Sequence, residues 1–156
     1  MARYSSTMQV TRAADYGIRV MIHLATLPAH ERALLPALAR ATGTPESFLS
    51  KVLQALCRAG FIVSRRGQAG GFELLPPGRK ASVRAVIEAV EGPISLNLCL
   101  LSGASCKRKS FCPAHPVWAS AQDAILQILS TATIADLALQ AATPQQRASR
   151  AKSKTP

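Results

Sequence analysis

The chain has 156 residues, 48% of them hydrophobic, which is enough for one sizeable core and too little for two ordinary domains. Its 19 Lys and Arg residues against 8 Asp and Glu give a formal net charge of +11, which favours a polyanionic partner such as nucleic acid or an anionic membrane surface. No stretch approaches the roughly 20 apolar residues that cross a bilayer, and residues 1–7 lack the apolar core of a signal peptide. We therefore expect a cytoplasmic protein that makes no use of a membrane.

Apolar periodicity predicts three helices in the N-terminal part of the chain. The first covers residues 13–27, between a Thr11 N-cap and Pro28, and a shorter one covers 35–41. Thr44 is the predicted cap of the third helix, Pro45 its first residue, and Gly60 its end. The apolar side chains of this third helix, which we expect to be buried, are Phe48, Leu49, Val52, Leu53 and Leu56.

The next segment predicts two short strands, 61–63 and 72–75, around a basic glycine-rich turn. A helix-turn-helix followed by this hairpin is a winged helix. A fourth helix is expected at 82–90, a segment without clear periodicity at 98–115, a long amphipathic helix from Pro116, a short helix at 133–139 and a disordered basic tail. The predicted fold is mostly α with a small β-wing: a winged helix-turn-helix plus a long C-terminal dimerisation helix, whose apolar face needs a partner.

The helix-turn-helix and the wing supply the candidate DNA-binding residues. The second helix of such a motif enters the major groove, where Ser and Thr can bond several base edges and Lys can contact guanine or phosphate. Arginines beside glycines in the wing can approach phosphates or enter a narrow minor groove, although such a pair can also be a solvated hairpin tip. The predicted set is Thr44, Ser47, Ser50 and Lys51 on the helix, with Arg65, Arg66 and Gln68 on the wing.

Three of the four cysteines are clustered, with six residues between Cys99 and Cys106 and five between Cys106 and Cys112. His115 follows three positions later. In a reducing cytosol, such cysteines are more often ligands or redox sensors than disulfides. Three thiolates and an imidazole form a complete ligand set for zinc or for an iron-sulfur cluster. The separations are wider than those of structural zinc knuckles, which favours wrapping around something larger than one ion.

Two further features bear on this loop. Lys107, Arg108 and Lys109 lie within it and would offset the negative charge of a thiolate-ligated cluster, or form an ordinary solvated basic turn. Cys57 falls inside the apolar stripe of the third helix, where we expect it to pack in the core rather than act as a ligand.

Together these segments resemble a bacterial regulator family, the IscR, NsrR and RirA type, also called the Rrf-two family. The resemblance covers about residues 8–139. It is carried by Met8-Gln9-Val10-Thr11, Asp15-Tyr16-Gly17-Ile18-Arg19, Phe48-Leu49-Ser50-Lys51-Val52-Leu53, Ala59-Gly60-Phe61, the wing Arg66-Gly67-Gln68-Ala69-Gly70-Gly71-Phe72 and the three-cysteine loop.

The resemblance implies a homodimer with crossed C-terminal helices that binds a pseudo-palindromic site in double-stranded promoter DNA, and an iron-sulfur cluster at the three cysteines as sensor. We expect a repressor that responds to cluster, redox or nitric oxide status. The predicted organisation is a DNA-binding domain at 8–78, the cluster loop and dimerisation helices at 79–139 and a tail at 140–156. The six residues between Cys99 and Cys106 depart from the five usual in the family.

The family offers two solutions for the fourth ligand. His115 matches the IscR-like histidine that holds a 2Fe-2S cluster, and we favour it because Cys112 and His115 close a short chelate. Asp15 matches the NsrR-like aspartate that reaches a 4Fe-4S cluster from the other subunit. A structural zinc or a cluster-free thiol switch at the same cysteines remains the alternative. An enzyme is not expected, because the acids are few and Glu88 and Glu91 have no histidine or lysine near them in sequence.

Overall fold

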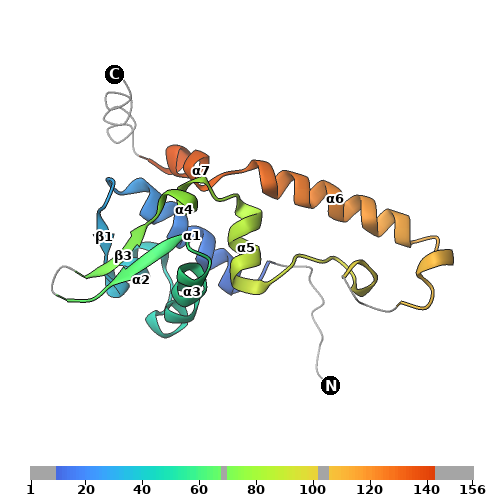
Figure 1. The fold of residues 1–156 in the computed structure, drawn as a ribbon, viewed down its shortest axis with the longest axis horizontal. Coiled ribbons are helices and arrows are strands. Elements are labelled where there is room, and N and C mark those ends of the chain that lie inside the picture. The colour runs from blue at the N-terminus through green and yellow to red at the C-terminus, as the bar shows by residue number, and fades with distance from the viewer. Residues whose placement is uncertain (1–9, 68–69, 102–105, 143–156) are drawn as a thin grey trace.

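The computed structural model describes residues 10–67, 70–101 and 106–142. In chain order the elements are α1 (Arg12–Thr26), β1 (Arg32–Ala33), α2 (Leu35–Thr42), α3 (Glu46–Arg58), β2 (Ile62–Arg65), β3 (Gly71–Leu74), α4 (Pro76–Lys80), α5 (Val83–Glu91), the 3-10 turns η1 (Leu98–Leu100) and η2 (Lys109–Phe111), α6 (His115–Thr131) and α7 (Ile134–Ala141). A mostly helical chain with a small antiparallel sheet confirms the predicted winged-helix fold (Figure 1).

Side-chain caps explain where several helices begin. Thr11 accepts a hydrogen bond from the Ala14 amide at the start of α1, as predicted, and Ser82 accepts one from Ala85 at the start of α5. Thr133 caps α7 in the same way through the amide of Asp136. The third helix departs from prediction, because Pro45 occupies the cap position and Thr44 lies before it.

The sheet has the strand order β1-β3-β2 and is antiparallel throughout. Ile62 pairs with Leu74 and Arg65 with Gly71, so β2 and β3 form the predicted wing hairpin. β1 is only two residues long and was not predicted, since so short a strand has no periodicity to detect. The short helix α4, for which the sequence predicted no element, begins at the paired prolines, because proline is tolerated in the first turn of a helix.

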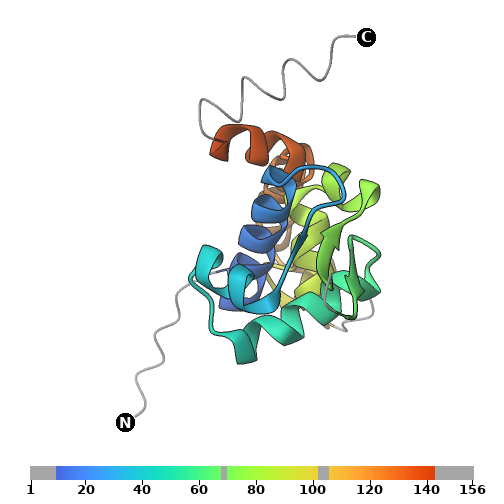
Figure 2. The same cartoon turned by 90° about the vertical axis from the view of Figure 1, so that its left-hand side faces the viewer.

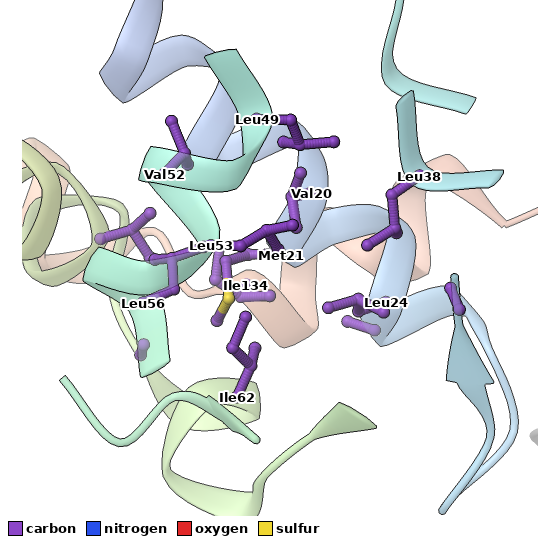
Figure 3. Packing of buried hydrophobic residues seen from close by; sticks show 14 of the residues in the cluster. Val20, Met21, Leu24, Leu38, Leu49, Val52, Leu53, Leu56, Ile62 and Ile134 are labelled. Atoms are coloured by element: carbon purple, nitrogen blue, oxygen red, sulfur yellow. The ribbon is translucent and has the colours of Figure 1, made fainter. Parts of the chain in front are cut away.

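One hydrophobic cluster joins almost every element. Val20, Met21 and Leu24 of α1 meet the apolar face of α3 and Ile62 of β2, as Figure 3 shows. Ile134 of α7 is 0% exposed within the same cluster, and Figures 1 and 2 show α7 lying against α1. The main core is therefore completed by α7, the last helix among the described residues, although α7 lies far beyond the wing in sequence.

α6 projects from this body as an arm (Figure 1). None of its residues, all of which the structure describes, is buried. The segment that contains α5, the cysteine loop and α6 is closed at its base by two backbone hydrogen bonds: the Val83 amide donates to Ala132 at 2.8 Å and the Ile134 amide donates to Ala81 at 2.9 Å. We call this pair the basal clasp.

Candidate DNA-binding face and metal-binding loop

The outward face of α3 carries exposed polar side chains. Leu49, Val52, Leu53 and Leu56 point into the core, so the opposite side of the helix faces away from the body. Ser47 and Lys51 are exposed on that side, as predicted. Gln54 and Arg58 are exposed on the same face of the helix. Sequence reasoning missed them, although Gln54 follows Lys51 by three residues and Arg58 follows Gln54 by four, which are the spacings of neighbours on one helix face.

Three predicted positions on or beside α3 differ from expectation. Thr44 is only 4% exposed, and its hydroxyl oxygen lies 3.0 Å from that of Thr42, so Thr44 is a buried part of the turn and is not presented outward. Ser50 is half-buried and its hydroxyl donates to the Glu46 carbonyl at 3.1 Å. Phe48, predicted to be buried, is 42% exposed; it lies at the edge of the core, where its ring contacts Tyr16 of α1.

The wing presents Arg65 and Arg66 with exposed side chains, and Gln68 lies outside the described residues. Gly71 at the base of the hairpin has φ +125°, and a Cβ there would lie 2.8 Å from the Ala33 carbonyl oxygen. Only glycine permits β1 and β3 to approach so closely at this point. The glycine requirement therefore comes from the sheet, while the arginines at the end of β2 remain available to a ligand.

A small ionic network ties β1 to β3. Glu73 of β3 has a side chain only 12% exposed and lies 3.0 Å from His30 Nδ1 and 3.2 Å from Arg32 Nε. The hydrogen bond with His30 and that with Arg32 lower the pKa of the Glu73 carboxyl, although desolvation acts in the opposite direction. The network holds the wing to the loop between α1 and α2.

The cysteine loop begins and ends against α6. The Leu96 amide donates to Gln122 Oε1 at 3.1 Å, and the turn η1, which carries Cys99, contacts α6. Cys112 precedes α6, and its carbonyl accepts from the His115 amide at 3.1 Å. Cys99 and Cys112 are half-buried, Cys106 is exposed, and all three are free thiols. The cationic side chains Lys107, Arg108 and Lys109 are exposed on the same loop.

Cys57 lies apart from this loop. Its side chain packs against the core cluster from the end of α3, as predicted. Burial raises the pKa of the Cys57 thiol, with a backbone hydrogen bond from Ser64 acting against the rise. A thiol held in its protonated form is a poor metal ligand.

Among the predicted ligands, His115 has a side-chain nitrogen without a hydrogen-bond partner. Its Nδ1 is buried and has no hydrogen-bond partner among the described residues. Asp15 lies elsewhere, on α1, where it forms an ion pair with Arg19 at 2.7 Å. Within the described ranges, no three Cys, His, Asp or Glu side chains are gathered closely enough to hold a metal ion. The chemistry of the donor set, three thiols and an imidazole with an unpartnered buried nitrogen, fits a metal group.

An exposed helix beside a β-wing on a compact helical body defines a winged-helix DNA-binding protein. Residues 10–140 match the Rrf2 family, described as an iron-dependent transcriptional regulator, and the chain belongs to this family. It is therefore a transcriptional regulator and not an enzyme. No helix in the part of the chain that the structure describes is long and apolar enough to span a membrane.

Several relatives are similar over most of their length. Protein aau3 of Rhizobium meliloti (strain 1021) is 30% identical over 131 residues, which cover 83% of this chain and 84% of that protein. The oxidized form of CymR from Staphylococcus aureus is 27% identical with a TM-score of 0.66, covering 84% of this chain and 96% of CymR. T. potens IscR, at 23% identity and a TM-score of 0.69, covers 96% of this chain and 93% of its own and shares the fold.

Proposed function

We propose that the chain is a homodimeric cytoplasmic repressor that binds double-stranded promoter DNA through α3 and the wing and senses cluster, redox or nitric oxide status through an iron-sulfur cluster. Cys99, Cys106, Cys112 and His115 hold the cluster, with a 2Fe-2S form favoured over 4Fe-4S. The observation that carries the proposal is the buried Nδ1 of His115, which has no partner among the described residues and follows Cys112 by one turn. A buried nitrogen of this kind is expected to bind something.

The chemistry of the loop favours a cluster over a single zinc ion. The wide cysteine spacings leave room for a group larger than one ion, and three exposed cations on the loop can offset the charge of thiolate-bound iron and sulfide. When bound, such a cluster supplies a redox-active centre that reacts with small oxidants. The chain's own contribution is to provide three thiolates and a neutral imidazole nitrogen, and to fasten one end of the loop to α6 through Gln122.

The homodimer follows from the exposed apolar side chains of α6. Val117 and Ile128 are each 67% exposed, and Trp118 is 37% exposed, on a helix with no buried residue among those described. Exposed large apolar side chains in a row mark an interaction surface. An antiparallel second copy of α6 offers the same apolar face and, through a two-fold axis, matches a pseudo-palindromic DNA site.

The decisive experiment measures iron, sulfide and zinc in protein purified without oxygen, together with its visible absorption spectrum. We expect iron and sulfide in the wild type, loss of both in Cys99→Ser, Cys106→Ser and Cys112→Ser, and retention in Cys57→Ser, the matched control. Zinc without sulfide in the wild type would contradict the proposal. So would a loop variant with full iron and sulfide content.

The fourth ligand is tested on the same protein. We expect His115→Ala to alter the visible spectrum and to speed the loss of iron, because the freed coordination site is left to solvent. Asp15→Ala should leave assembly unchanged, since Asp15 is already paired with Arg19. The opposite pattern would assign the ligand to Asp15 and favour a 4Fe-4S cluster that spans two subunits.

A cluster-free thiol switch at the same cysteines is the second candidate. It is favoured by the free state of Cys99, Cys106 and Cys112, of which Cys106 is exposed and the other two are half-buried. It is also favoured by the similarity to two CymR proteins: that of S. aureus has been solved in an oxidized form, and that of B. subtilis is described as a global cysteine regulator. The metal analysis separates the two functions. A colourless protein without iron, whose DNA binding changes on treatment with peroxide and recovers with a reducing thiol, would support the switch.

A further inference from the structure

An aromatic side chain lies at the edge of the otherwise polar outward face of α3. Phe48, in the first turn of the helix, is 42% exposed. With about 100° of rotation per residue, it lies only about 60° around the helix from Lys51. Ser47, its neighbour in sequence, is exposed as well. Phe48 is thus part of the surface that the proposed function places in the major groove.

The ring of Phe48 is held in place from behind. It meets the Tyr16 ring edge to face, with centroids 5.6 Å apart and planes inclined at 81°. Tyr16 in turn packs against the main core cluster, and the Arg19 guanidinium lies 6.0 Å from its ring centroid. Edge-to-face contacts between aromatic rings are favourable, so the Tyr16 ring supports one side of the Phe48 ring while 42% of Phe48 stays exposed. The outer part of the Phe48 ring is therefore a fixed apolar surface open to a ligand.

The fold does not need Phe48 as a core residue. The inner face of α3 is filled by Leu49, Val52, Leu53 and Leu56, none of them more than 2% exposed. In the major groove, the apolar group that distinguishes one base from the others is the C5-methyl of thymine. Serine and lysine beside Phe48 can bond base edges and phosphates, but they do not recognise a methyl group specifically.

We propose that Phe48 reads a thymine methyl group in each half-site of the operator and is a specificity-determining residue of this regulator. The proposal rests on the proposed placement of α3 in the major groove. It gives α3 an apolar contact that complements the polar contacts of Ser47 and Lys51. Tyr16 acts as a positioning residue, because it touches Phe48 and not the base.

The test removes the methyl group from the DNA rather than from the protein alone. Operator duplexes are first selected from a random pool with the full-length wild-type protein at fixed salt. Each thymine of a half-site is then replaced by deoxyuridine, which pairs in the same way but lacks the methyl. We expect one position where the replacement weakens binding about fourfold, as for the loss of one buried methyl group. At that position Phe48→Ala should make the thymine and deoxyuridine duplexes bind equally.

Matched controls keep the result specific. Leu34→Ala removes another exposed apolar side chain, 56% exposed in the structure, and should leave the thymine preference unchanged. Phe48→Leu keeps an apolar group and should retain part of the preference, and it replaces Phe48→Ala if that variant does not fold. The thymine is also replaced by cytosine in one duplex and by 5-methylcytosine in another. The methylated duplex should bind the wild type more tightly than the unmethylated one, and the two duplexes should bind Phe48→Ala equally.

The outcomes distinguish the inference from the proposed function. A wild type that selects no sequence from the pool would overturn the placement of α3 in the groove. Selective binding with no position sensitive to deoxyuridine would overturn methyl reading alone. A uniform loss of affinity in Phe48→Ala, with its thymine preference intact, would assign the ring to the sugar-phosphate backbone and likewise overturn the inference.

Discussion

Ile134→Ala tests whether α7 is part of the same core as the helix-turn-helix and the wing. Ile134 is the first residue of α7 and is 0% exposed between side chains of α1, α3 and β2 (Figure 3). The substitution removes three carbon atoms from a filled site. At about 0.8 kcal/mol for each, the transfer term is about 2.4 kcal/mol. The cavity left behind adds to it, so we expect a total loss of about 3–4 kcal/mol.

The assay is urea unfolding followed by circular dichroism at one fixed protomer concentration, because the stability of a dimer depends on concentration. The matched control is Leu139→Ala on the same helix, where the side chain is 45% exposed and the loss should stay below about 1 kcal/mol. Ile134→Ala should shift a single transition without splitting it. A loss under about 1 kcal/mol, or a separate early transition for the C-terminal part, would refute the shared core.

Three further predictions concern the wing and α3. Gly71→Ala should destabilise the protein by about 1–3 kcal/mol, and by more than Gly43→Ala, because a Cβ at Gly71 meets the Ala33 carbonyl whereas nothing lies within 4 Å of a Cβ at Gly43. Thermal unfolding of the two variants measures these losses of stability, and equal losses would contradict the reasoning. Glu73→Gln should lower Tm at neutral pH. Because the pKa of Glu73 is lowered in the folded protein, the difference in Tm between the wild type and Glu73→Gln should be complete above the unfolded pKa of about 4.3 and vanish as the pH falls through the folded pKa. A difference in Tm that grows at acid pH would exclude this role of Glu73. Lys51→Ala should change sequence preference with a loss of about 1–3 kcal/mol, while Arg66→Ala should weaken binding to operator and scrambled DNA alike; unchanged affinity in both would argue against the predicted interface.

Periodicity in the sequence was sufficient for the long helices and the wing, because each depends on local alternation of apolar residues. It failed where a neighbour distant in sequence decides burial. Phe48 lies at the edge of the apolar stripe of α3, and its exposure depends on how α1 packs beside it, which the periodicity of α3 does not encode. Thr44 looked like an outward cap but is enclosed beside Thr42 in the turn.

The metal-binding loop illustrates the same limit. Cysteine spacing suggested the candidate donors, since residue types and separations are properties of the chain itself. The orphaned Nδ1 of His115 was not visible in the sequence, because its burial depends on how the loop and α6 pack. The two-residue strand β1 was equally hidden, since it exists only through pairing with Glu73 and Phe72 of β3.

The basal clasp allows the segment that it closes to change in length at little cost to folding. The segment between Ala81 and Ile134 begins with α5, which packs into the body, and continues with the cysteine loop and α6, which projects from it; the hydrogen bonds of the basal clasp join the two ends of this segment. For a closed segment of about 50 residues, one additional residue raises the entropic cost of closure by well under 0.1 kcal/mol. The sixth residue between Cys99 and Cys106, one more than is usual in the family, therefore adds almost nothing to the entropic cost of closing this segment. If the proposed sensing role of the cysteine loop is right, insertions and deletions in that loop can change the group that it binds, while the surface of α3 and the wing, which the loop does not form, keeps its shape.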